Sequence, residues 1–275
     1  MTPKTPPHWL GLEDRVCVVT GAASGIGAAI ASSLARVGAR VALLDRDLAG
    51  AQRVASEITP QAEDVLAVHC DIADEDSVQA AADRVRAELG SCHALINNAG
   101  LLRAAALSAV SLADWNHVLS VNLTGYLLCA RVFAQSMREA GQGSIVNVAS
   151  VSGLFPQTGS GSYSASKAGV LLMSRQMAVE WGPEGIRSNA ICPGMIRTAL
   201  SASFYEEPGL EARRAAVTAS RRIGEPQDIA DVALFLASPR SAYVNGAEIS
   251  VDGGMTSMLM DMVPRPGFNN NAIAV

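Results

Sequence analysis

The sequence contains few aromatic residues and no concentration of positive charge. Phe, Trp and Tyr make up 4% of the 275 residues, while 49% of the residues are hydrophobic. The core must therefore be built mainly from Ala, Val, Leu and Ile, whose small side chains suit close packing of helices against a sheet. A formal net charge of −5, without a cluster of Lys and Arg, argues against a nucleic-acid-binding surface.

The sequence also lacks the cysteine pattern of a disulfide or zinc framework. Its cysteines are odd in number, widely spaced and without a CxxC pair: Cys17, Cys70, Cys92, Cys129 and Cys192. We therefore expect free, buried thiols in a reducing compartment and no metal site.

Targeting and membrane signals are missing as well. Residues 1–11 contain three prolines and no apolar core of a signal peptide. No uninterrupted apolar run approaches the roughly 18 residues that are needed to cross a bilayer. The sequence thus predicts a soluble, cytoplasmic protein without a membrane partner.

Short apolar runs alternate with helical segments along most of the chain. The runs predict strands at 15–20, 40–44, 65–70, 93–96, 145–150, 186–191 and 247–251. Helices are predicted from the first glycine-rich turn to about residue 37, then at 48–58, 74–89, 111–141, 163–181 and 225–236, with a flap at 195–222. This alternation predicts an α/β, Rossmann-like fold with one doubly wound parallel sheet, in a single domain at 12–254. Residues 1–11 are expected to form a flexible extension and 255–275 a C-terminal tail.

A glycine-rich turn with the spacing TGxxxGxG follows the first predicted strand. Gly21 permits a tight turn, Gly25 lets the backbone approach a ligand, and Gly27 allows the helix to lie close to the sheet. The unpaired N–H groups at the start of this helix, around Ser24 and Ile26, favour a phosphate. Three glycines in a turn are common, but the order strand, turn, helix predicts a dinucleotide site.

An acidic residue ends the second predicted strand, eighteen positions after Gly27. The carboxylate of Asp45 can accept hydrogen bonds from both ribose hydroxyls of NAD, and it repels the 2′-phosphate of NADP. Arg46 follows directly and could hold that phosphate, whereas Ala23 and Ser24 add no positive charge. The pattern favours NAD over NADP, although a solvated carboxylate at a strand end is the simpler interpretation of Asp45.

Further polar and small residues follow the later strands at the same predicted edge of the sheet, where ligands bind. We expect contacts with the cofactor from Asp71, Ile72, Asn98, Ala99, Gly100, Pro193 and Gly194. Asp71 and Asn98 are placed to meet an adenine and its ribose, but a role in an ordinary turn accounts for either residue equally well.

The segment YSASK places a phenol and an amine one helical turn apart. Tyr163 and Lys167 lie on the same face of a predicted helix, where a fixed ammonium would favour the phenolate and lower its pKa. Ser150, thirteen residues earlier, would bring a hydroxyl into the same cleft from a strand end. The three groups could serve as acid/base, tuning cation and donor to a substrate oxygen. YxxxK by itself is also typical of an ordinary surface helix.

One polar residue interrupts the apolar stripe of the helix predicted at 111–141. A buried amide in mid-helix must find hydrogen-bond partners. Asn122 is therefore either a structural hydrogen bonder or a part of the site.

Together these motifs resemble those of the short-chain dehydrogenase/reductase family, over roughly residues 12–254. The shared marks are TGxxxGxG at 20–27, NNAG at 97–100, Asn122, Ser150, YxxxK at 163–167 and PG at 193–194. The resemblance implies that Tyr163 transfers the proton and that Ser150 orients the substrate oxygen. It implies that Lys167 holds the ribose and lowers the pKa of Tyr163, while Asn122 positions a water on the proton path.

The resemblance also implies contacts and an assembly. The backbone of Ile196 and the side chain of Thr198 would hold the nicotinamide carboxamide. Family members are usually dimers or tetramers built on the helices that carry Asn122 and Tyr163, so we expect an oligomer, such as a homotetramer. The methionine-rich tail at 255–275 either is disordered or packs on a neighbouring subunit or the substrate pocket.

These observations predict an NAD-dependent oxidoreductase that reversibly oxidises a secondary alcohol to a ketone. Candidate substrate-contacting residues, besides Ser150 and Tyr163, are Ser152, Phe155, Met195, Phe204 and Tyr205. This mixture favours a neutral polyol, sugar or cyclic alcohol over a charged thioester. An NADPH-dependent carbonyl reductase and a non-catalytic dinucleotide sensor or scaffold are the alternatives.

Overall fold

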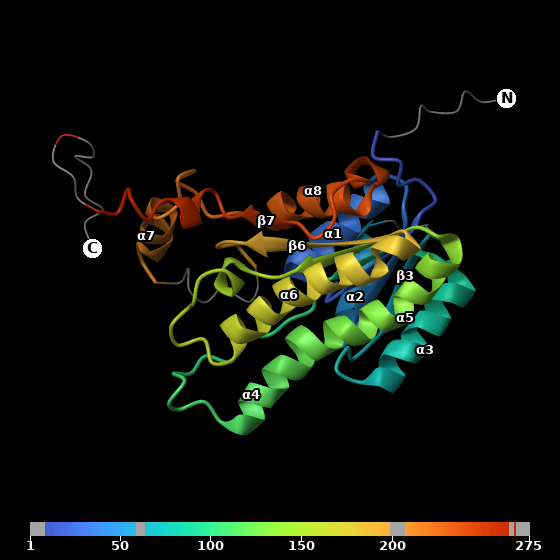
Figure 1. Cartoon of the computed structure of the whole chain (residues 1–275), viewed down its shortest axis with the longest axis horizontal. Helices are drawn as coiled ribbons and strands as arrows, with labels where there is room; N and C mark the ends of the chain where they lie inside the picture. The colour runs from blue at the N-terminus through green and yellow to red at the C-terminus, as the bar shows by residue number, and fades with distance from the viewer. Residues whose placement is uncertain (1–8, 59–63, 199–206, 264–266, 268–275) are drawn as a thin grey trace.

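The chain folds around a seven-stranded parallel sheet, seen in a computed structural model that describes residues 9–58, 64–198, 207–263 and 267 (Figure 1). The strands are β1 (Val16–Thr20), β2 (Arg40–Asp45), β3 (Val65–His69), β4 (Cys92–Asn97), β5 (Gly143–Val148), β6 (Ile186–Pro193) and β7 (Glu248–Val251). Their order across the sheet is β3-β2-β1-β4-β5-β6-β7. The predicted Rossmann-like, doubly wound fold in one domain is confirmed.

The main helices are α1 (Gly25–Arg36), α2 (Leu48–Ile58), α3 (Glu75–Glu88), α4 (Leu112–Leu119), α5 (Gly125–Ala140), α6 (Tyr163–Trp181), α7 (Leu210–Ala216) and α8 (Pro226–Ala237). The caps follow local chemistry: the Asp74 carboxylate accepts from the backbone N–H groups of Asp76 and Ser77, so α3 begins at Glu75. The other predicted helices agree with the structure to within a few residues, and the one at 111–141 contains a turn of different winding.

Alternate side chains of each buried strand point to opposite faces of the sheet and so pack into two separate hydrophobic cores. In β1, Val16 and Val18 belong to the core beneath α3, α5 and α6, whereas Cys17 and Val19 belong to the core beneath α1, α2 and α8. Both faces of the sheet are covered, as strands without a polar face require. All five cysteines are buried and free, as predicted.

The strand order reverses between β1 and β4, and this switch point positions the site. The chain leaves β1 toward one edge of the sheet and returns at β4 toward the other. The loops that lead into α4 and α6, together with α7, gather beyond the carboxyl ends of the strands, at the left of Figure 1. Any ligand at the switch point therefore meets loops from both halves of the sheet.

The helix predicted at 111–141 is interrupted by a π-helical turn, η1 (Ser120–Thr124). This turn contains Asn122 and is continuous with α4 on one side and α5 on the other. Apolar periodicity cannot reveal one extra residue within a turn, and π-turns occur frequently at functional sites. The predicted, mostly helical segment at 111–141 is thus confirmed, and the π-turn within it is a feature that the sequence did not predict.

By length and a mean hydropathy of 1.2, the helical segment Leu112–Ala140 could cross a membrane. The sequence prediction considered only uninterrupted apolar runs and missed it, because polar residues divide this segment. In the structure 44% of its most apolar window is buried, and α5 packs against β4, β5 and α3. A core helix of a soluble fold meets the same two criteria.

Two other predictions differ from the structure at their ends. β5 stops at Val148, so Ser150 lies beyond the strand and begins a short 3-10 turn, η2 (Val151–Gly153). In the tail, η6 (Met255–Ser257) is followed by a buried Met258, whereas Met260 and Met262 are exposed. The first residues of the tail therefore pack on the domain. Residues 264–266 and 268–275 lie outside the described part of the chain.

Candidate active site

The glycine turn after β1 is held by a close contact with the chain that leaves β4. A Cβ at Gly21 would lie 2.6 Å from the Ala99 Cα, and one at Gly27 would lie 2.1 Å from the Gly21 carbonyl oxygen. The Thr20 hydroxyl accepts from the backbone N–H groups of Asn98 (3.0 Å) and Ala99 (3.1 Å). Only glycine fits at these two positions, and the turn packs directly against the backbone that leaves β4.

Asn98 acts on the same turn. Its amide nitrogen donates to the carbonyl oxygens of Thr20 (3.0 Å) and Gly21 (3.1 Å). This side chain therefore shapes the cofactor turn, and its predicted contact with an adenine stays a prediction. Gly25 has a φ of +56° and lies against Thr198, whose Cβ would be 3.4 Å from a Cβ at position 25. The chain after β6 thus closes over the glycine turn.

The carboxylate of Asp45 is fixed at the end of β2. One oxygen accepts from the Ala23 backbone N–H at 2.9 Å and the other from the Asp47 N–H at 2.8 Å. The half-buried carboxylate is thus placed beside the glycine turn with lone pairs remaining for a ligand. The neighbouring Arg46 is exposed.

The residues predicted after β3 are tied into the fold. An Asp71 carboxylate oxygen accepts from the Ala73 N–H at 3.0 Å. Ile72 is 4% exposed, and its side chain lies where a Cβ at Gly125, the first residue of α5, would approach to 2.8 Å. The Ile72 side chain therefore packs in the core, which leaves its backbone as the group that a cofactor could reach.

Tyr163 and Ser150 meet at the start of α6. Tyr163 is the first residue of that helix, and a hydrogen bond from Ser150 favours its ionised form. The Ser150 hydroxyl also accepts from the Ser152 backbone N–H at 3.0 Å, which fixes the serine at the start of η2. A phenol and a hydroxyl thus share one point at the carboxyl end of β5.

Lys167 lies one turn further along α6, with its amine 5.8 Å from the centre of the Tyr163 ring. The amine donates to the Val148 carbonyl at 2.8 Å and to the Tyr126 hydroxyl at 3.4 Å. Tyr163 and Lys167 therefore face one environment, as their spacing predicts. Among the described residues, the close groups around the amine are oxygen dipoles rather than carboxylates.

Burial changes the expected electrostatics of this pair. Desolvation lowers the pKa of Lys167 to about 7, so its amine is only partly protonated at neutral pH. Desolvation also raises the pKa of Tyr163, and the opposing influence comes from the Ser150 hydrogen bond. The net shift of the phenol pKa in the free protein is therefore upward, and its lowering by a protonated Lys167 stays a prediction.

Asn122 is completely buried and connects the site to the loop after β4. Its side-chain oxygen accepts from the Leu101 N–H, and its nitrogen donates to the Leu101 carbonyl, both at 2.9 Å. The same nitrogen donates to the Ser166 hydroxyl at 3.2 Å. A Cβ at Gly100 would lie 3.4 Å from the Asn122 oxygen and 3.6 Å from the Lys167 amine. Asn122 is therefore a structural hydrogen bonder next to Lys167, and its part in the chemistry stays a prediction.

The residues that follow β6 form the opposite wall. Gly194 lies against Asp252, and Ile196 pairs with Gly224. The Met195 sulfur accepts from the Arg214 guanidinium at 3.2 Å, which connects this wall to α7. On the facing wall Ser152 is half-buried and Phe155 is 55% exposed. Phe204 and Tyr205 lie outside the described residues.

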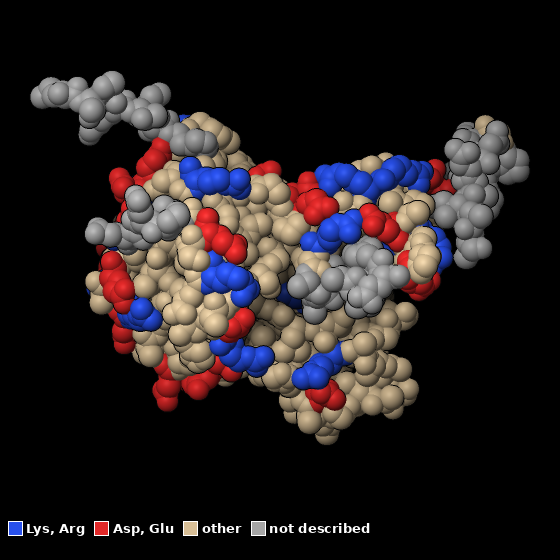
Figure 2. Space-filling view, turned by 180° about the vertical axis from the view of Figure 1, so that it is seen from behind, with Lys and Arg blue, Asp and Glu red and all other residues tan. Residues whose placement is uncertain are grey.

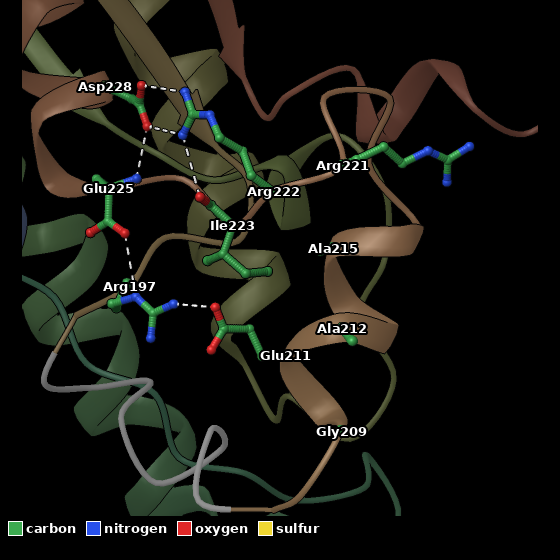
Figure 3. Close-up of a pocket in the computed structure, with 10 residues that line it drawn as sticks. All are labelled: Arg197, Gly209, Glu211, Ala212, Ala215, Arg221, Arg222, Ile223, Glu225 and Asp228. Atoms are coloured by element: carbon green, nitrogen blue, oxygen red, sulfur yellow. Dashed lines mark hydrogen bonds and ion pairs between the residues drawn. The ribbon is translucent and has the colours of Figure 1, made fainter.

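An open pocket of about 790 Å³ borders this wall, between Arg197, α7 and the start of α8 (Figure 3). Arg197 donates to Glu211 of α7 at 2.5 Å and to Glu225 at 3.3 Å, and Arg222 pairs with Asp228 at 2.7 Å. The pocket is lined by paired charges and lies beside the chemistry, not at it.

The face opposite to that of Figure 1 shows no preference for one sign of charge. Seen from the side opposite to that of Figure 1, Lys and Arg alternate with Asp and Glu, and the surface is hollowed near its middle (Figure 2). This agrees with a small-molecule cleft and not with a polyanion-binding surface.

The match of the chain to known proteins agrees with this geometry. A family model described as enoyl-(acyl carrier protein) reductase matches residues 21–256. The chain is 42% identical to D-threitol dehydrogenase of Mycolicibacterium smegmatis over 89% of this chain and 94% of that one. The chain belongs to the short-chain dehydrogenase/reductase family.

Two further comparisons define this membership. Cis-4-hydroxycyclohexanecarboxylate dehydrogenase of Sinomonas cyclohexanicum is 43% identical over 89% of this chain and 98% of that one. The solved gluconate 5-dehydrogenase of Burkholderia cenocepacia, in complex with NADP and tartrate, superposes with a TM-score of 0.85 at 32% identity, over 90% of this chain and 96% of that one. Like these relatives, the chain is a dehydrogenase acting on CH–OH groups.

Sequence reasoning overlooked two contributors. Thr20 appears only as the first letter of the glycine motif, yet its hydroxyl holds the turn after β4. Tyr126 was not singled out at all, yet its hydroxyl contacts Lys167. Its spacing of four residues from Asn122 was the available signal, since both must then lie on the face of the helix that meets the site.

Gly27→Ala should abolish tight dinucleotide binding, because its Cβ would collide with the Gly21 carbonyl and with the Asn98 amide at 2.6 Å. We expect the Kd for NAD, measured by calorimetry, to rise at least about tenfold, which corresponds to roughly 1.4 kcal/mol. Gly182→Ala is the control, since its Cβ would meet only the Asn245 side chain at 3.4 Å. Equal NAD affinity in the two variants would contradict this account of the turn.

Proposed function

We propose that this dehydrogenase oxidises a secondary alcohol of a neutral polyol, sugar or cyclic alcohol to the ketone, reversibly, with NAD as cofactor. The observation that carries the proposal is the meeting of Tyr163 and Ser150 one helical turn from Lys167, whose amine lies near Gly100 in the chain that packs on the glycine turn. Relatives named for D-threitol and for cis-4-hydroxycyclohexanecarboxylate support this substrate class.

The residues of the glycine turn fit a dinucleotide. Gly21 and Gly27 have no room for a side chain, Gly25 is in a left-handed conformation, and α1 starts directly after Ser24, whose side chain does not cap the helix. Asp45 would hold the ribose hydroxyls, and Ile196 and Thr198 would hold the carboxamide. When bound, the nicotinamide takes up the hydride that leaves the alcohol carbon.

The protein supplies the movement of the proton. Ser150 donates to the substrate oxygen and orients it, while Tyr163 removes the hydroxyl proton as the carbonyl forms. Lys167, once protonated, stabilises the phenolate across the 5.8 Å between its amine and the ring centre. Asn122 keeps the loop at 100–101 against the Lys167 amine. Ser152, Phe155 and Met195, together with Phe204 and Tyr205, would line the substrate end of the cleft.

Asp45 is the reason for naming NAD. Its carboxylate stands beside Ala23, where the 2′-phosphate of NADP would bring a second negative charge. The alternative is an NADPH-dependent carbonyl reductase in which Arg46 binds that phosphate, and the NADP-bound gluconate 5-dehydrogenase favours it. A non-catalytic sensor would leave the Tyr163–Ser150 pair without a purpose.

We also propose a cytoplasmic homotetramer or homodimer that acts on a small molecule. The exposed apolar side chains of Leu172 and Val179 on α6 suit an interface between copies. Free cysteines agree with a reducing compartment.

Tyr163→Phe should lower kcat for NAD reduction by roughly 10²- to 10⁴-fold, the usual contribution of a positioned acid/base. The assay uses a panel of tetritols, hexitols and cyclohexanols, with the Kd for NAD measured in parallel and expected to change less than about twofold. Tyr243→Phe, at a fully exposed tyrosine, is the control. Full turnover by Tyr163→Phe would remove the mechanism, and an inactive wild type that binds NAD would favour a sensor.

Asp45→Asn keeps the shape of the side chain and removes its charge. We expect the ratio of kcat/KM for NAD to that for NADP to fall about tenfold or more, which corresponds to roughly 1.4 kcal/mol, because the repulsion of the 2′-phosphate is lost. Asp47→Asn, two residues on, controls for a nearby charge. A wild-type enzyme that prefers NADP, and loses this preference in Arg46→Ala, would establish the alternative.

A further inference from the structure

The hydroxyl of Tyr126 lies next to the amine of the site. Tyr126 is completely buried on α5, one turn after Asn122. Its hydroxyl donates to the Val148 carbonyl at 3.1 Å and accepts from the Lys167 amine at 3.4 Å. Because Lys167 itself donates to the same carbonyl at 2.8 Å, the three groups close a triangle.

The Val148 carbonyl does not by itself explain this hydroxyl. The carbonyl already accepts a short hydrogen bond from Lys167, so a phenylalanine at position 126 would leave no unpaired backbone acceptor. A buried hydroxyl is costly unless it is hydrogen-bonded. The other role of the Tyr126 oxygen is to accept a hydrogen bond from the Lys167 amine. This amine also lies 5.2 Å from the centre of the Tyr126 ring.

The groups around Lys167 offer few other means of holding a positive charge. Tyr126 faces it from α5, Tyr163 from its own helix α6, and Cys192 from β6. Burial raises the pKa of the Cys192 thiol to about 12 and that of both phenols above the usual range, so all three are neutral in the free protein. Two oxygens, those of Val148 and Tyr126, are therefore the closest stabilising partners of the ammonium that the structure describes.

We propose that Tyr126 is a positioning residue that holds Lys167 and keeps it protonated. This inference rests on the proposed roles of Tyr163 and Lys167. Removal of the hydroxyl takes away one of two oxygen partners of a buried ammonium and thereby favours the neutral amine. The loss of ammonium then withdraws support from the Tyr163 phenolate. Tyr126 acts on the chemistry only through Lys167.

The chain permits a direct measurement, because Lys4 and Lys167 are its only lysines. In a Lys4→Arg background with ¹³Cε-labelled lysine, a single resonance reports the titration of Lys167. We expect Tyr126→Phe to lower the pKa of Lys167 by about 0.5 to 1 unit, a roughly three- to tenfold shift in the protonation equilibrium. An unchanged titration would overturn the proposal.

Ser136→Ala is the matched control. Ser136 lies on the same helix, is buried, and donates to the backbone carbonyls of Phe133 at 3.1 Å and Cys92 at 3.4 Å. It has no hydrogen bond to Lys167 among those described, so its loss should leave the titration unchanged. Tyr126→Leu replaces Tyr126→Phe if the latter is insoluble, since it also removes the hydroxyl.

Activity gives a second, independent readout. With saturating NAD, the wild-type kcat/KM for the alcohol should exceed that of Tyr126→Phe about three- to tenfold at pH 8 and equal it near pH 5.5, where both proteins carry the ammonium. A purely structural role would lower kcat/KM by one factor at every pH, which would contradict the proposal. Tyr163→Phe distinguishes failure of the proposed function from failure of this inference. If Tyr163→Phe is fully active, the proposed function fails. If Tyr163→Phe is inactive but the ratio of wild-type to Tyr126→Phe kcat/KM does not change with pH, only the role of Tyr126 is overturned.

Discussion

The close approach of two strand-end turns at the switch point is the constraint on which the site depends. The chain leaving β1 and the chain leaving β4 touch through Gly21 and Ala99, and Thr20 and Asn98 bind them together. This contact sets where a dinucleotide can lie, and the backbone after Asn98 then runs directly to the amine of Lys167. Cofactor turn and acid/base pair are therefore positioned by one piece of backbone.

Desolvation determines the protonation states of the titratable groups in the site. Lys167 and Tyr126 are buried and Tyr163 is half-buried beside them, and desolvation moves their pKa values toward the neutral forms, lowering that of the amine and raising those of the phenols. In water an ammonium beside a phenol would simply acidify it, whereas here each charge must first be supported by fixed dipoles. Activation then depends on hydrogen bonds as much as on the distance between the two side chains.

Much of the fold followed from local sequence signals. Seven apolar runs gave strands within a few residues of their observed ends, and the carboxylate at Asp74 marked the start of α3 correctly. The meeting of Tyr163 with Ser150 and Lys167 was predictable because helical spacing and strand ends act over short distances. The shared burial of the pair, the closure of Asn122 on Leu101 and the contact of Tyr126 depend on packing between distant elements, and no spacing rule encodes that.

The π-turn at Ser120–Thr124 has a consequence for how this chain can vary. The turn holds one residue more than a regular helix needs, and each residue rotates a helix by about 100°. Deleting one of the other four residues of the turn would restore regular winding and rotate α4 about its axis, which would move the Asn122 amide away from Leu101. A homologue with a gap at this point would thus keep the sheet but lose the position of Asn122, whereas a homologue without the gap can keep both.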